Sequence, residues 1–286
     1  MKLFLLIMGV CVATAGGIGM WYFSAGSFPE VRFSDIEAGF ENISEEFEQG
    51  EEVLLPKDQF ETLSPTGMGQ FSRWGRYWRE FSEGEKKFYE NWKRPEGPLQ
   101  VGVQVGHWKN NEVPEELSGL KRNGGGASGG GKSEWEAVLA IAQQTKILLE
   151  ARGIVVDLLS ATIPVGYSAD AFMSIHADGN GSAAISGFKI AGPRRDFSGR
   201  ASALVSALYE SYGRETGLDQ DTNVTRRMSG YYAFNWRRYE HAIHPMTPAV
   251  IIETGFMTSP DDRAIIIDRP DRAAKGIADG IINFLL

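Results

Sequence analysis

The chain is poor in cysteine: Cys11 is the only one among its 286 residues, and it lies inside an apolar segment. An internal disulfide needs two cysteines, so the core must hold by packing alone. Cys11 also does not fit a lipid-attachment motif, because Val10 stands where such a motif has a small residue.

The chain also lacks an excess of basic residues. It has 29 Lys and Arg against 37 Asp and Glu, a formal net charge of −8. Proteins that bind nucleic acid neutralise phosphates with a basic surface. The composition therefore predicts no nucleic-acid partner.

The first 23 residues form an apolar segment. Lys2 precedes an almost unbroken apolar run over residues 3–23, which is long enough for a spanning helix of roughly 20 residues. The run ends in an aromatic group at Trp21, as at a membrane interface. We therefore predict an uncleaved transmembrane anchor over residues 1–23 and a cell-membrane location. The alternative is a signal peptide cleaved after Ala15, which would release a secreted protein. Either way, the rest of the chain lies outside the cytoplasm.

Residues 24–98 have the pattern of an acidic, aromatic and mostly helical stalk or linker. A capping box at Ser34 opens a helical stripe of apolar residues that ends near Gly50. A second, aromatic stripe spans residues 71–92, and its helical spacing favours packing on the main domain over stacking on sugars. The breaker sequence at residues 95–98 marks a boundary.

From residue 99 the pattern changes to alternating strands and helices, which predicts an α/β fold with an open, mostly parallel sheet flanked by helices. The expected strands are 101–105, 154–159, 171–175 and 249–252, and the expected helices are 133–152, 198–216, one opening at 259, and 271–284.

Four polar side chains should meet at one rim of this sheet. His107 follows the first expected strand, while His176 and Glu253 end the third and the fourth. Glu134 opens the helix that follows the first strand, and ligands bind outside the carboxyl ends of strands in open α/β sheets. Ser133 and Glu136 form a capping box, which leaves Glu134 free to face elsewhere.

Two histidines and one glutamate are a common catalytic zinc set, with water in the open fourth position. A further carboxylate at Glu253 could act as general base and then as proton donor to a leaving nitrogen. Taken singly, each residue also has an ordinary structural explanation, such as a hydrogen-bonded loop histidine or an acid at a helix start.

The segments around these residues resemble the zinc-dependent N-acetylmuramoyl-L-alanine amidases of the amidase-3 type. The likeness covers residues 99–286 and is carried by Val105-Gly106-His107, by Glu134 before Val138-Leu139-Ala140, by Ser174-Ile175-His176-Ala177-Asp178 and by Ile252-Glu253-Thr254-Gly255-Phe256. The resemblance implies an amidase catalytic domain that cuts the bond between muramic acid and L-alanine in peptidoglycan. It also implies Zn²⁺ on His107, Glu134 and His176, with Glu253 as catalytic acid/base.

Two further residues are candidates for substrate contacts. Asp178 stands where the family usually has asparagine, and Trp108 where it usually has glycine, so the contacts to substrate are expected to differ. His244 precedes Pro245 near the rim and is either a substrate contact, an extra ligand or a surface histidine.

Residues 126–133 match the phosphate-loop pattern G-x-x-x-x-G-K-[ST], but no strand-like run precedes them, as that motif requires. We therefore interpret them as a flexible loop, and a nucleotide partner is not expected. The leading hypothesis is a membrane-tethered cell-wall hydrolase. The alternative is a catalytically silent peptidoglycan-binding or scaffold module of the same fold.

Overall fold

The computed structural model describes residues 91–286, which belong to one compact unit of the chain. The predicted membrane anchor at residues 1–23 and nearly all of the predicted stalk lie outside the described residues. Within residues 91–286, no helix is long and apolar enough to cross a membrane.

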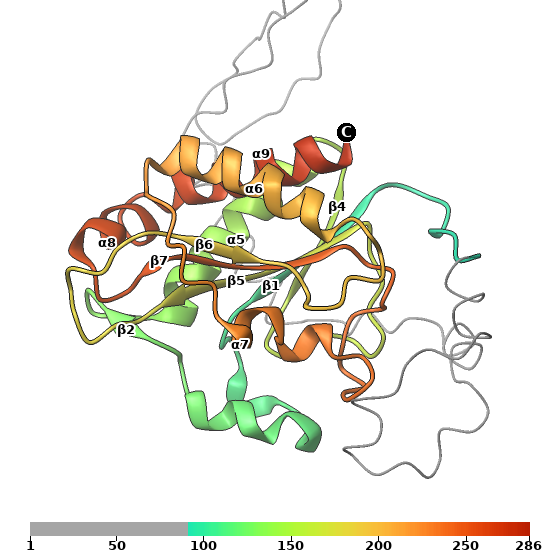
Figure 1. The fold of residues 1–286 in the computed structure, drawn as a ribbon, viewed down its shortest axis with the longest axis horizontal. Coiled ribbons are helices and arrows are strands. Elements are labelled where there is room, and N and C mark those ends of the chain that lie inside the picture. The colour runs from blue at the N-terminus through green and yellow to red at the C-terminus, as the bar shows by residue number, and fades with distance from the viewer. Residues whose placement is uncertain (1–90) are drawn as a thin grey trace, which may run out of the picture. The chain divides into compact units, whose positions relative to one another are not determined.

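The centre of the fold is a five-stranded sheet in the order β4-β1-β5-β7-β6 (Figure 1). Its strands are β1 (Gln100–Val105), β4 (Val155–Leu159), β5 (Ala171–Asp178), β6 (Lys189–Ala191) and β7 (Ala249–Phe256). The neighbours β4-β1, β1-β5 and β5-β7 run parallel, and β6 pairs antiparallel with β7. The sheet is therefore mixed, with one antiparallel edge strand on a parallel core.

Two features of this sheet correct the sequence-based expectation. The strand β5 continues to Asp178 and β7 to Phe256, so His176 and Glu253 lie within strands and not at their ends. The edge strand β6 was not predicted, because three residues that include a buried Lys189 show no strand pattern.

Helices cover one face of the sheet. The strand residues on this face are mostly small or β-branched and pack with α5 (Glu134–Glu150), α6 (Ala201–Thr216) and α9 (Pro270–Leu285) in one buried cluster. In Figure 1, α6 and α9 lie along one side of the sheet and α7 (Arg226–Ser229) lies on the other.

Short elements and loops cover the opposite face. They form a second buried cluster around Phe172 and Ile251, which alternate along β5 and β7 with residues of the helical face. The short elements on this face are η2 (Asn110–Glu112), η3 (Glu115–Asn123), α7 and η4 (Tyr232–Phe234). The chain also forms a hairpin of β2 (Ser128–Gly129) with β3 (Lys132–Ser133). A further helix, α8 (Pro260–Ile266), follows β7. His176 and Glu253 have the same parity as Phe172 and Ile251, so they point to this loop-covered face.

Residues 91–99, the described segment before β1, contact the sheet domain without forming a helix or strand. The ring of Trp92 stacks on His244 with 5.6 Å between ring centroids. The guanidinium of Arg94 pairs with Asp170 at 2.6 Å. Trp92, the last residue of the aromatic stripe, thus packs on the main domain outside any helix. The other residues of the stripe lie outside the described residues.

Candidate metal centre

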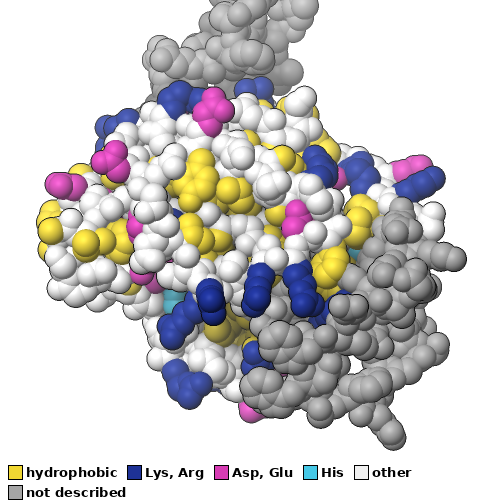
Figure 2. All heavy atoms as spheres, in the orientation of Figure 1, with side chains coloured by type: hydrophobic (Ala, Val, Ile, Leu, Met, Phe, Trp, Pro, Cys, Tyr) yellow, Lys and Arg dark blue, Asp and Glu magenta, His cyan; other side chains and the backbone are white. Residues whose placement is uncertain are grey.

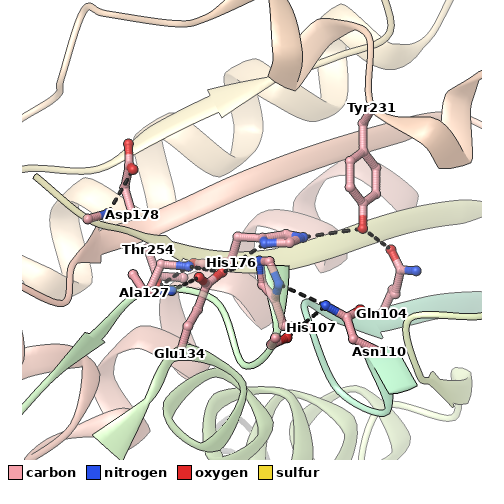
Figure 3. A network of polar contacts seen from close by, with 12 residues as sticks. Gln104, His107, Asn110, Ala127, Glu134, His176, Asp178, Tyr231 and Thr254 are labelled. Atoms are coloured by element: carbon pink, nitrogen blue, oxygen red, sulfur yellow. Dashed lines mark hydrogen bonds and ion pairs between the residues drawn. The ribbon is translucent and has the colours of Figure 1, made fainter. Parts of the chain in front are cut away.

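His107, Glu134 and His176 converge at the carboxyl rim of the sheet (Figure 3). One ligating atom from each lies within 4.8 Å of the others. His176 Nδ1 is 2.8 Å from Glu134 Oε1, and His107 Nε2 is 3.4 Å from the same oxygen. The three residues come from β5, the start of α5 and the turn after β1, so the topology of the sheet brings them together.

Glu134 is held in place by the start of its helix. Glu136 accepts a hydrogen bond from the backbone N–H of Ser133 at 2.8 Å and completes the predicted capping box. Glu134 is thereby left to face the histidines. Its Oε2 accepts from the Ala127 N–H at 2.9 Å, and its Oε1 from the Ala177 N–H at 3.1 Å.

The turn that carries His107 is tightly constrained. His107 has φ 63°, in the left-handed region that costs a residue with a side chain about 1 kcal/mol or more. The Asn110 amide fixes its ring through Nδ1 at 3.1 Å. The neighbouring Gly106 allows the approach of His176, because a Cβ there would lie 2.5 Å from that ring.

A chain of hydrogen bonds orients His176 from behind. Its Nε2 lies 3.3 Å from the Tyr231 hydroxyl, which donates to Gln104 Oε1 at 3.1 Å. Gln104 in turn donates to Ser160 O at 3.2 Å and to the hydroxyl of Tyr232. When His176 carries its proton on Nε2, that N–H donates to the Tyr231 hydroxyl, and the unprotonated Nδ1 faces Glu134. No sequence signal pointed to Tyr231 or Gln104, because their roles arise only when the loop after α7 folds onto β1.

The donor set suits zinc. Structural chemistry places Zn–N and Zn–O bonds near 2.0–2.2 Å, so tetrahedral ligand atoms lie roughly 3.3 Å apart. The separations of 2.8 and 3.4 Å about Glu134 Oε1 bracket that spacing. A ligating histidine also donates its second ring nitrogen to an outer acceptor, and the Tyr231 hydroxyl can accept from His176 Nε2. His107 Nδ1 instead faces a donor, the amide nitrogen of Asn110.

Burial and mutual contact shift the pKa values of all three residues of the cluster. Burial opposes the charge of His176, but its hydrogen bond with Glu134 and nearby carboxylates raise its pKa on balance. Burial also opposes the charge of Glu134, yet the two histidines lower its pKa. Burial lowers the pKa of His107, which favours the neutral imidazole that binds metals.

Glu253 lies beside this cluster but is not part of it. It pairs in register with His176 across β5 and β7, and strand neighbours are about 4.8 Å apart with side chains on the same face. Burial, helped by the carboxylates of Glu134 and Asp178, raises the pKa of Glu253 to about 8.

The two predicted substrate contacts take different positions. Asp178 pairs with the buried Lys189 at 2.8 Å, and Lys189 also pairs with Asp221 at 2.7 Å. His244 is buried and accepts a hydrogen bond from the Met246 N–H at 3.2 Å. Neither joins the metal cluster among the described residues, and their contact with substrate stays a prediction.

The glycine-rich loop folds against the metal centre. Its tip forms the β2–β3 hairpin with Gly130 and Gly131 at φ 60° and 79°, the two left-handed positions of a tight two-residue turn. At its base, the Ala127 N–H serves Glu134. A Cβ on Gly126 would lie 2.7 Å from the His107 ring. The loop thus builds the wall of the site.

A comparison with protein families decides the assignment. Residues 101–283 match the Amidase_3 model, described as N-acetylmuramoyl-L-alanine amidase. The chain belongs to this amidase family. The match spans β1 to α9, and so includes the elements that carry the candidate metal centre and Glu253.

Solved structures of amidases are similar to this chain at low identity. The catalytic domain of CwlV, from Bacillus (Paenibacillus) polymyxa var. colistinus, is 22% identical, with a TM-score of 0.47 over 65% of this chain and 98% of that one. The amidase AmiC2 of Nostoc punctiforme is 20% identical, with a TM-score of 0.49 over 67% and 99%. Ami1 from Mycobacterium smegmatis is 22% identical, with a TM-score of 0.47 over 65% and 96%. No curated protein matches the chain. The family assignment therefore rests on the sequence match.

Proposed function

We propose that this member of the amidase family is a zinc-dependent hydrolase that cuts the amide between N-acetylmuramic acid and L-alanine in peptidoglycan. The observation that carries the proposal is the meeting of His107, Glu134 and His176 beside Glu253. A silent binding module would need neither this donor set nor an adjacent acid with a raised pKa.

His107, Glu134 and His176 would hold the metal ion. When bound, zinc supplies a Lewis acid that polarises a carbonyl and acidifies water. The residues around the ligands set their orientation: Asn110 fixes one ring, and Tyr231 fixes the other. A site whose ligands are already placed needs little reorganisation during the reaction.

Glu253 would move the proton. Its carboxylate takes a proton from the attacking water and returns it to the alanine nitrogen as the amide bond breaks. Burial supports this role, because a carboxyl with a pKa near 8 in the metal-free site holds a transferred proton well. Positive charge at the ligand cluster would bring this pKa closer to neutral.

Purified protein incubated with intact sacculi tests the proposal. We expect new N-terminal alanine to appear while the glycan strands stay intact, and we expect Glu253→Gln to abolish the release. In the same preparation His176→Ala should lose bound zinc, because it removes one of three ligands. Wild-type protein that binds zinc but exposes no new N-terminal alanine would leave only the scaffold alternative.

We further propose that the domain works outside the cytoplasm, tethered to the cell membrane through residues 1–23. The apolar run after Lys2 supports this placement. Fractionation of cells that express the full chain tests it, since a cleaved signal segment would release the domain to the medium.

A further inference from the structure

A small basic pocket lies on the loop-covered face of the sheet, beside the metal centre. It encloses about 90 Å³. Its lining combines four arginines with aromatic rings: Arg194, Arg195, Arg237, Arg238, Phe197 and Trp236. Figure 2 shows Lys and Arg side chains gathered in a row across the face that carries α7, with histidine surface visible at one end. This concentration of positive charge contrasts with a chain whose net charge is −8.

Three of the four arginines of this pocket, Arg194, Arg195 and Arg238, have no acidic partner among the described residues, since no carboxylate pairs with them within 4.0 Å. The nearest acid in sequence, Asp196, is turned to the start of α6, where it accepts from the Ala201 N–H at 2.8 Å. Like charges held together repel, so an arginine cluster of this kind is suited to an anionic ligand.

Aromatic rings hold one of these arginines in place. The Arg237 guanidinium lies 5.1 Å from the Trp236 ring centroid and 5.7 Å from that of Phe197. Cation–π contacts of this kind fix the plane of a guanidinium. The pocket therefore has an ordered wall as well as charge.

The pocket and the metal centre share a partition. Gly230 and Phe234 line the pocket, and Tyr231 lies between them in sequence. The Tyr231 ring packs on Phe234 with 5.7 Å between centroids, while its hydroxyl lies 3.3 Å from His176 Nε2. Tyr231 thus joins the wall of the pocket to a candidate metal ligand, which places the two sites close together.

We propose that this arginine pocket is a subsite for a free carboxylate on the peptide portion of the substrate. The inference rests on the proposed function and extends it to substrate selection. The sugar next to the scissile amide is N-acetylated and neutral, whereas the peptide carries side-chain and C-terminal carboxylates. Arginine is the side chain best matched to a carboxylate, because its planar fork donates two parallel hydrogen bonds.

Binding of the peptide alone tests the subsite without any need for catalysis. The probe is a peptide that begins with L-alanine and carries two free carboxylates, compared with its fully amidated form on the full-length protein. We expect the wild type to bind the carboxylate form about tenfold more tightly, as for charged hydrogen bonds. Arg195→Gln and Arg238→Gln should remove that preference, and Arg195→Lys should keep part of it.

Arg214→Gln is the matched control. It removes the same charge from an exposed arginine on α6, which packs on the helical face of the sheet. It should leave the preference for the carboxylate form intact. Equal affinity of the wild type for the two peptides, or the same loss in Arg214→Gln, overturns the proposal.

Hydrolysis separates this inference from the proposed function. With muramoyl-peptides in the two forms, the pocket variants should raise KM about tenfold for the carboxylate form alone and leave kcat unchanged. A fall in kcat on both forms would contradict a subsite. A wild type that selects the carboxylate peptide but cleaves neither substrate would overturn the amidase proposal and leave the subsite standing.

Discussion

Glu253 lies in an environment very different from that of a free side chain. Its pKa is raised to about 8 by burial among other acids, so the folded metal-free protein keeps a proton that the unfolded chain releases above pH 4.5. The native state then binds more protons than the unfolded state, and stability falls as pH rises between those two values.

This predicts a pH-dependent stability that belongs to one residue. In chelator-treated protein, the Tm of the wild type should fall more between pH 5 and pH 8 than the Tm of Glu253→Gln, because glutamine has no proton to lose. Thermal unfolding at the two pH values measures the difference. Equal losses in both proteins would show that the carboxyl is ionised throughout.

Tyr231 is a positioning residue for the proposed zinc site. Tyr231→Phe removes the hydroxyl that joins His176 Nε2 to Gln104. Loss of such an outer partner weakens metal binding about tenfold or more. We expect zinc affinity, measured by competition with a chelator, to fall by that amount.

Tyr239→Phe serves as the control, since Tyr239 packs on the Tyr232 ring in the same region without a contact to His176. Zinc affinity should stay unchanged in this variant. Unaltered affinity in both variants would mean that the hydrogen-bond chain does not orient the ligand.

At the scale of elements, the backbone of the loop before α5 accounts for glycines that also match a phosphate-loop motif. Gly126 and Gly131 both have left-handed φ, of 78° and 79°. A Cβ at Gly126 would meet His107 and Glu134, whereas one at Gly131 would have nothing within 4 Å.

The pair Gly126→Ala and Gly131→Ala therefore separates backbone strain from contact with the site. Both should lose about 1 kcal/mol of stability from the left-handed alanine, and Gly126→Ala should lose more because its methyl group also clashes with His107 and Glu134. Only Gly126→Ala should also weaken zinc binding and amide hydrolysis, because its methyl group pushes on two ligands. The same zinc affinity in the two variants would sink the assignment of this loop to the site wall.

The elements were largely predictable because their signals are local. The capping box placed the start of α5 at Glu134, and alternating valines placed β1 before His107. The sequence did not predict that β5 continues to Asp178 and β7 to Phe256. His176, Asp178 and Glu253 are polar, and polar residues at the end of an apolar run are typical of a loop. The pair of Lys189 with Asp178 could not be predicted, since it joins β6 to β5 across β7, and only the folded sheet places these strands in that order.

At the scale of the whole molecule, the two faces of one sheet do different work. The helical face buries a continuous apolar cluster that stabilises the domain. The other face carries the candidate metal centre, Glu253 and the arginine pocket under short loops. A stable face behind a loop-built face lets the site vary without loss of the fold.

Among the described residues, both buried clusters consist of residues after 98, and we expect residues 91–286 to fold without the preceding 90. A fragment of residues 91–286 should unfold cooperatively, bind one zinc ion and release peptides with a new N-terminal alanine from soluble muramoyl-peptides. A shorter fragment of residues 99–286 should do the same with a Tm lower by about 2–4 °C, because it lacks the stacking of Trp92 on His244 and the pair of Arg94 with Asp170.

Arg94→Gln in the longer fragment divides these two contributions. An exposed ion pair contributes little to stability, so most of the difference in Tm should remain with Trp92. Calorimetry of the three proteins measures this, with zinc content as a second readout. If the shorter fragment had a lower Tm and also failed to bind zinc, residues 91–98 would belong to the site, and the boundary at residue 98 would be wrong.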